Sequence, residues 1–143
     1  MRDGKKAFWI NLVIILLLIA IVTIRSVMGG DSNTAFTLQE DRLTLSGPGD
    51  FMVSFEFVNV ASLEFRETFD RGSCISGESG KTYSYGVWEN AEFGQYTLHA
   101  LTKVSACIVV TETDGGVIVF NVDNAKTTEE FASSLAEHLK NFS

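Results

Sequence analysis

The sequence predicts an α+β fold: an N-terminal transmembrane helix, a mostly antiparallel β domain of about seven strands, and a C-terminal α-helix. Three observations support this prediction. An uncharged apolar run covers residues 7–24, polar and apolar side chains alternate through much of residues 35–122, and apolar side chains then recur every four residues from Phe131. A period of two is typical of strands and a period of nearly four is typical of helices.

The apolar run AFWINLVIILLLIAIVTI, residues 7–24, is long enough to cross a membrane. At about 1.5 Å per residue it spans roughly 27 Å, and with Arg25 turned outward the stretch to residue 28 covers a hydrocarbon core of about 30 Å. We therefore expect a transmembrane helix over residues 7–28. A cleaved signal peptide is the alternative, because small residues follow the run, although the run exceeds a usual signal core and Arg25 interrupts the approach.

Charges around this run predict its orientation. Arg2, Lys5 and Lys6 precede the run and are opposed only by Asp3. Because segments rich in Lys and Arg stay in the cytoplasm, we expect the N-terminus to be cytoplasmic and the rest to lie across the cell membrane. The predicted division is a cytoplasmic N-terminus at 1–6, a transmembrane helix at 7–28, a linker at 29–34, a domain at 35–143, and an extracytoplasmic location for 31–143.

The predicted extracytoplasmic part is strongly acidic. Residues 31–143 hold seven basic and seventeen acidic side chains, a formal net charge of −10. Such a surface repels nucleic acid and anionic lipid headgroups. We therefore expect no nucleic-acid partner, and we expect the chain to be an integral membrane protein held by its one predicted span.

Alternating side chains predict four strands in the first half of the domain. AFTLQ (35–39) and RLTLS (42–46) read as a hairpin, and FMVSFEF (51–57) and ASLEFRE (61–67) read as two further half-buried strands. The Gly- and Ser-rich stretch 69–81 is predicted to be an irregular loop.

The second half predicts a strong hairpin followed by a helix. KVSACIVVTE (103–112) and VIVFNV (117–122) flank Asp-Gly-Gly, which is a tight-turn signal. Phe131, Leu135 and Leu139 form the apolar stripe of an amphipathic helix, and Thr127 with Glu130 has the spacing of a capping box. The stripe must be buried, so we expect this helix to pack against a sheet or the mouth of a barrel.

Aromatic side chains gather in TYSYGVWENAEFGQYTL, residues 82–98. Two interpretations remain open: a core layer, which is favoured because aromatic side chains pair across strands, or an exposed surface that binds a protein. The candidate partner surface consists of Tyr83, Tyr85, Trp88, Phe93 and Tyr96.

Catalytic and metal-binding patterns are missing from the sequence. His99 and His138 lack the spacing of metal ligands, and no nucleophile elbow, phosphate-binding loop or dinucleotide motif occurs. We therefore expect a protein that is not an enzyme and has no cofactor. Cys74 and Cys107 would lie where thiols can be oxidised, and whether they form a disulfide or Cys107 is a free core residue is left open.

Three segments carry a resemblance to a known family. They are LTLSGPGDFMVSFEFVNVASLEF (43–65), the Gly94-x-Tyr96-x-Leu98 strand start, and IVVTETDGGVIVFNVDNAKTTEEFASSLAEHL (108–139). Together they resemble the small bacterial pleckstrin-homology-like (PH-like) domains that follow one membrane helix in Gram-positive proteins. This resemblance implies a bent antiparallel β-barrel closed at one end by the C-terminal helix.

The resemblance also bears on ligands. Phosphoinositide-binding members of the wider superfamily use basic residues in an early loop, and the corresponding residues 47–50 include none, so phosphoinositide binding is not expected. The function that we expect is that of a single-pass, membrane-anchored PH-like domain acting as a non-catalytic protein-binding or assembly module on the extracytoplasmic side. The alternative is a small-ligand-binding domain that uses the open end of the barrel.

Overall fold

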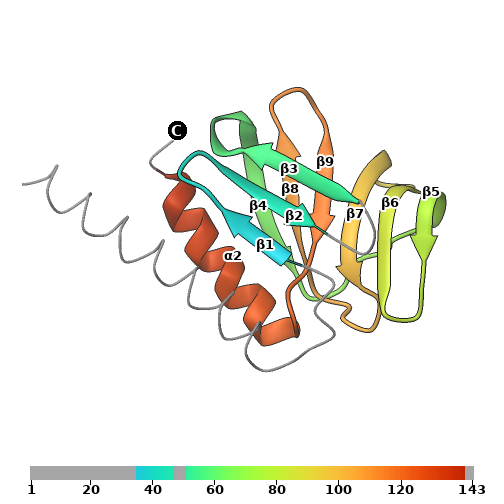
Figure 1. The fold of residues 1–143 in the computed structure, drawn as a ribbon. Coiled ribbons are helices and arrows are strands. Elements are labelled where there is room, and N and C mark those ends of the chain that lie inside the picture. Colours follow the sequence, from blue (N-terminus) through green and yellow to red (C-terminus); the bar gives the residue numbers. More distant parts are fainter. Residues whose placement is uncertain (1–34, 47–50, 141–143) are drawn as a thin grey trace, which may run out of the picture.

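The computed structural model describes residues 35–46 and 51–140, which form nine strands and one α-helix (Figure 1). Within this part of the chain, no helix has the length and apolar character that crossing a bilayer requires. The predicted transmembrane helix at 7–28, the N-terminus at 1–6 and the linker at 29–34 lie outside the described residues, as does the predicted orientation.

A three-stranded antiparallel sheet begins the described chain. It contains β1 (Ala35–Leu38), β2 (Arg42–Ser46) and β3 (Met52–Glu56) in sequence order. The predicted hairpin is confirmed, and Leu43 and Leu45 are buried as their alternation indicates. After β3, the 3-10 helix η1 (Phe57–Asn59) leads the chain into the second sheet.

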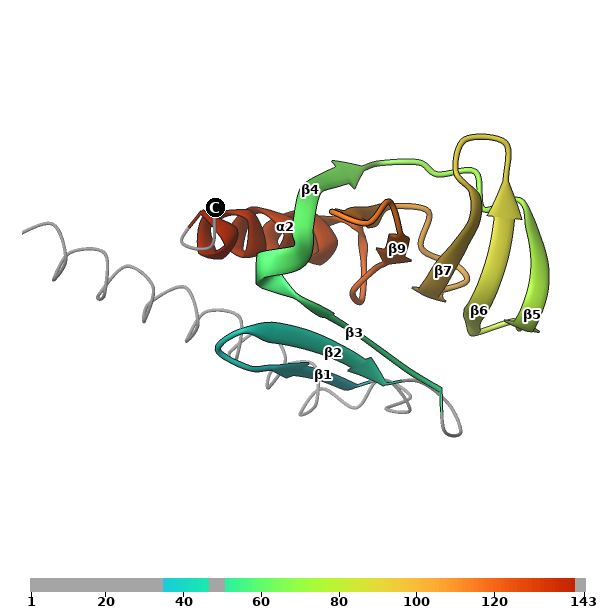
Figure 2. The ribbon, with the colours of Figure 1, turned by 90° about the horizontal axis from the view of Figure 1, so that it is seen from above.

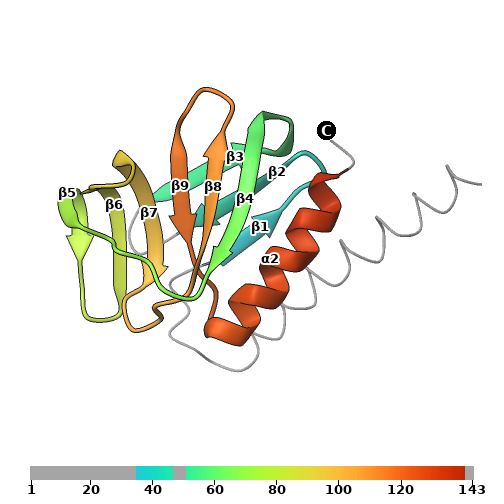
Figure 3. The ribbon, with the colours of Figure 1, turned by 180° about the vertical axis from the view of Figure 1, so that it is seen from behind.

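The second sheet has six strands in the order β4-β8-β9-β7-β6-β5. Its members are β4 (Val60–Arg66), β5 (Ser73–Ser79), β6 (Tyr83–Asn90), β7 (Gly94–Leu101), β8 (Cys107–Glu112) and β9 (Val117–Phe120). β7 and β9 are parallel and the other neighbours are antiparallel. The β8–β9 hairpin is therefore inserted between β4 and β7, as Figure 3 shows.

The two sheets pack as layers (Figure 2), and aromatic rings from both sheets meet in the core. Phe36 and Phe55 from the smaller sheet approach Phe120 of β9, each with ring centroids 6.3 Å apart. Phe131 of the helix lies 5.8 Å from Phe36 and 6.1 Å from Phe120. These rings join both sheets and the helix in one buried cluster.

The predicted PH-like β-barrel of about seven strands is wrong. The described residues form nine strands in two separate sheets, and no strand of one sheet pairs with a strand of the other. Phenylalanine rings between the layers explain this, because sheets packed face to face stand about 10 Å apart whereas paired strands lie about 4.8 Å apart. The two sheets do not close into a barrel, and Figure 2 shows β5 and β6 of the larger sheet extending beyond the smaller sheet.

The C-terminal helix is confirmed as α2 (Ala125–Leu139). Phe131 and Leu135 are buried and Leu139 is partly buried, so its apolar stripe packs in the core as expected. The cap differs from the prediction, because Asn124 and not Thr127 is the N-cap residue. The Asn124 side chain accepts a hydrogen bond of 2.9 Å from the Thr127 N–H, which satisfies a backbone donor of the first turn.

Asn121, just after β9, holds the connection between β7 and β8. Its amide nitrogen donates to the carbonyl oxygens of Leu101, Val104 and Ala106 at 3.0–3.3 Å, and its oxygen accepts from the Leu101 N–H at 2.7 Å. The strand predicted from residue 103 starts only at Cys107, because this buried side chain fixes the preceding residues as a loop.

Replacing Asn121 with alanine is expected to lower the free energy of unfolding by about 2–4 kcal/mol, because the loop carbonyls and the Leu101 N–H lose their buried partner. Thermal unfolding followed by circular dichroism measures this change. Asn59→Ala is the matched control: the Asn59 side chain is exposed, and the loss there should stay within about 0.5 kcal/mol. Equal losses for the two variants would contradict the role given to Asn121.

Candidate functional site

The five aromatic residues of the candidate partner surface divide between core and surface. Trp88 and Tyr96 are buried in a second apolar cluster on the face of the larger sheet that points away from the smaller one, and Tyr83 is also buried. Tyr96 donates a hydrogen bond of 2.7 Å to the Arg71 carbonyl oxygen. Only Tyr85 and Phe93 are partly exposed, so a partner can reach just two of the five rings directly.

An ion pair covers the Phe93 ring. Arg66 binds Glu92 through two hydrogen bonds of 2.6 Å, and its guanidinium carbon lies 5.8 Å from the Phe69 ring centre and 5.5 Å from that of Phe93. The hydrogen bonds from Arg66 lower the pKa of Glu92. This pair fastens the end of β4 to the β6–β7 turn, and Phe93 therefore serves the packing of that turn.

The two cysteines are free thiols. Cys107 is buried and Cys74 is partly buried, and both belong to the second apolar cluster. Burial raises the pKa of Cys107 to about 12, so little reactive thiolate forms near neutral pH. Arg71 nearby donates to the carbonyl oxygens of Leu101 and Val104 at 3.0 and 2.7 Å, which anchors the same loop that Asn121 holds.

The two histidines are buried among aromatic rings. The ring of His99 lies 5.9 Å from that of Phe51, and the ring of His138 lies 5.0 Å from that of Phe57. Burial lowers the pKa of His138. In the described ranges, no group of three His, Cys, Asp or Glu side chains is placed to hold a metal ion.

Strand β5 ends the larger sheet, and its outer edge is free of any other strand that the structure describes. The prediction of an irregular loop at 69–81 is wrong there, because Ser73–Ser79 pairs with β6. No strand among the described residues pairs with the other side of β5, and six of its seven residues are exposed. Natural edge strands are usually guarded by Lys, Pro or inward charges. The sequence SCISGES has only Glu78 as a charge, although a bulge interrupts its pairing between Cys74 and Ser76.

Two opposed glycines let β5 lie close against β6. Gly77 faces Gly86 in the register, with φ angles of +132° and +107° that side chains rarely allow. A Cβ at Gly86 would overlap the carbonyl oxygen of Ser76, and one at Gly77 would overlap that of Tyr85. The free edge therefore depends on glycine at both positions.

The only charge on β5 is turned toward the sheet. The Tyr85 hydroxyl forms a hydrogen bond with Glu78, which raises the pKa of Tyr85, and the Tyr85 ring lies 4.8 Å from that of Phe51. The backbone edge of β5 is thus not shielded by this carboxylate. Tyr85 positions the Glu78 side chain and is itself partly buried.

An open hollow of about 570 Å³ lies beside the start of β5, and we call it the edge hollow. Ser73 and Ile75 line it from β5, Glu89 from β6, and Asp70 from the preceding segment. Half of the Ile75 surface is exposed. Neither Asp70 nor Glu89 forms an ion pair with another described residue. The edge hollow therefore offers two carboxylates next to an apolar side chain.

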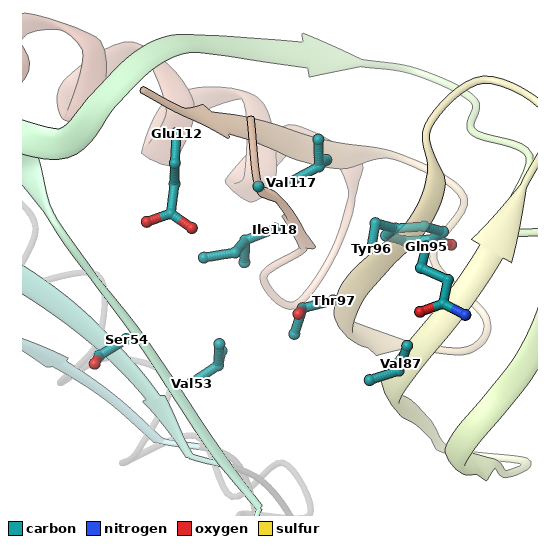
Figure 4. Close-up of a pocket in the computed structure, with 10 residues that line it drawn as sticks. Val53, Ser54, Val87, Gln95, Tyr96, Thr97, Glu112, Val117 and Ile118 are labelled. Carbon is teal, nitrogen blue, oxygen red and sulfur yellow. The ribbon is translucent and has the colours of Figure 1, made fainter. Parts of the chain in front are cut away.

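A second open space, the β3 groove, lies between the edge of β3 and the larger sheet and has a volume of about 300 Å³. Figure 4 shows Val53 and Ser54 on one side, Ile118 and Thr97 facing them, and Glu112 at one end. Burial raises the pKa of Glu112, and the nearby Asp114 adds to this. The groove is at the lower limit of the volumes that enclose small ligands, and it is open along one side.

Comparison with known proteins finds no matching family model, no matching curated protein and no matching solved structure. The resemblance to PH-like domains stays a prediction, and the closed barrel that it implied is absent from the described residues.

Sequence reasoning missed both the edge of β5 and the edge hollow. Most of their residues are short, polar or glycine and give no strand period, so the only local signal was Ile75, which stands between Cys74 and Ser76. An exposed sheet edge becomes visible only when the order of strands is known.

Proposed function

We propose that this chain is a single-pass, membrane-anchored and non-catalytic module that binds or assembles with another protein on the extracytoplasmic side. The apolar segment 7–28 anchors it, and the acidic composition of residues 31–143 argues against direct binding to anionic headgroups or nucleic acid. No cofactor is required for such a role.

The free edge of β5 carries this proposal. An extended peptide can add to an exposed sheet edge, where main-chain hydrogen bonds supply affinity and side-chain contacts supply specificity. β5 presents seven residues, enough for such pairing, and most of them are exposed. The partner in this proposal is a protein that contributes an extended segment.

Site-specific cross-linking in cells tests this function. When Ser76 is replaced by the photo-reactive amino acid p-benzoylphenylalanine, irradiation is expected to give a discrete protein adduct, whose partner mass spectrometry then identifies. The control places the same amino acid at Ser133, which is exposed on α2. Absence of an adduct at Ser76, or the same adducts at both positions, would contradict binding at the edge. A partner confined to the cytoplasm would contradict the orientation.

A further inference from the structure

We propose that the edge of β5 binds an extended segment in which basic and apolar residues alternate, with the basic residue placed over the edge hollow. This inference rests on the proposed function and specifies the chemistry of its partner. It follows from the placement of side chains next to the free edge.

The edge hollow has one exposed apolar side chain, Ile75, beside two acidic ones. Ile75 on β5 has half of its surface exposed and lines the edge hollow, whereas Val87 on β6, with 37 % of its surface exposed, lines the β3 groove. Ser73 is paired with Glu89, so this carboxylate lies next to the start of β5. Side chains of an added strand would alternate between the two faces of the sheet, and every second one would lie on the face of the edge hollow.

The carboxylates of Asp70 and Glu89 lack a cation among the described residues. Arg42, Arg66 and Lys140 are engaged by other carboxylates. The Arg71 guanidinium is held by backbone carbonyls. A Lys or Arg side chain from a partner would supply the missing positive charge, and the hollow of about 570 Å³ has room for it.

Charge repulsion argues against two other occupants of this edge, a second copy of the chain and an acidic strand. A second copy of this chain would bring its own Asp70 and Glu89, and its residues 31–143 carry a net charge of −10, so the two surfaces would repel each other. An acidic strand would meet the same repulsion. A basic, partly apolar strand is the occupant that fits both the carboxylates and Ile75.

Peptide binding to the whole chain in a zwitterionic detergent tests this assignment. The probe is a short, blocked, fluorescent peptide of alternating valine and lysine, and its matched control alternates valine and glutamate. Fluorescence anisotropy should show binding of the lysine peptide that weakens as salt is added, and weaker or no binding of the glutamate peptide. Hydrogen exchange should slow at the backbone amides of β5 when the lysine peptide is present.

Variants locate the charge contribution. The double change Asp70→Asn with Glu89→Gln should weaken binding of the lysine peptide about fivefold or more, because two partly exposed ion pairs are lost. Asn at residue 70 keeps the oxygen that accepts from the Gly72 N–H. Glu129→Gln, at an exposed glutamate on α2, removes one charge elsewhere and should leave the affinity within about twofold.

Three results would overturn the assignment: equal binding of the two peptides, unchanged affinity of the double variant, or no protection of β5. If the cross-linker at Ser76 nevertheless gave a protein adduct in cells, the proposed function would be supported, and only the inference that the partner segment is basic would be rejected. If the lysine peptide bound at β5 while the cross-linker at Ser76 gave no adduct in cells, the preference of the β5 edge for a basic segment would be supported, and the proposed function would be rejected.

Discussion

Leu135→Asp is expected to unfold the described domain. Leu135 is fully buried on α2, in the cluster that joins Phe131 of the same helix to both sheets. A carboxylate at this position would be buried without a partner, at a cost of more than about 4 kcal/mol, against a stability of about 5–15 kcal/mol for a typical domain. Circular dichroism and the dispersion of amide signals in NMR spectra measure the loss of structure.

Ser133→Asp provides the control for this variant. Ser133 is exposed and lies on the same helix two residues earlier, so an aspartate there meets water and should change the stability by no more than about 0.5 kcal/mol. A folded Leu135→Asp variant with a native spectrum would contradict the packing of Leu135 in the buried cluster.

Gly86→Ala is expected to separate β5 from the larger sheet and to destabilise the domain by about 3 kcal/mol. The backbone at Gly86 has a φ of +107°, and the added Cβ would overlap the carbonyl oxygen of Ser76. Hydrogen exchange should therefore quicken at β5 more than at β8 and β9. The adduct expected from a cross-linker at Ser76 should be lost as well.

Gly94→Ala is the control that distinguishes backbone strain from the steric overlap expected at Gly86. Gly94 has a φ of +69°, but no heavy atom lies within 4 Å of the Cβ that alanine would add. The variant should lose only about 1 kcal/mol, the cost of the left-handed backbone. If both alanine variants showed the same stability and the same exchange at β5, the close approach of β5 to β6 would be contradicted.

Local patterns predicted the elements whose signals lie within a few residues. Alternating Leu43 and Leu45 identified β2, the Asp-Gly-Gly sequence identified the turn between β8 and β9, and the stripe of Phe131 and Leu135 identified α2. Each of these elements buries one face, so the period of its apolar residues is visible in the sequence.

The architecture and the candidate site required knowledge of distant pairings. Parallel pairing of β7 with β9 joins strands that are separated by β8, and no local pattern indicates it. Strand β5 has no apolar period, because its structure comes from pairing with β6. Trp88 and Tyr96 could not be assigned from the sequence for the same reason. Their neighbours in the sequence were compatible with a core or with a surface, and only the packing of the β4–β5 connection over them places them in the core.

The insertion of the β8–β9 hairpin has a consequence for how the chain reaches its native state. β4 and β7 each gain their inner neighbour only from residues that follow Ala106, and α2 comes later still. During synthesis, β4 and β7 therefore keep unpaired edges until β8 and β9 follow, and Phe120 and Phe131 are still missing from the buried cluster. Pairing of such late and distant segments is slow, and open edges invite association with other chains. The interval between synthesis of β7 and of β9 is when this chain is expected to depend most on a chaperone.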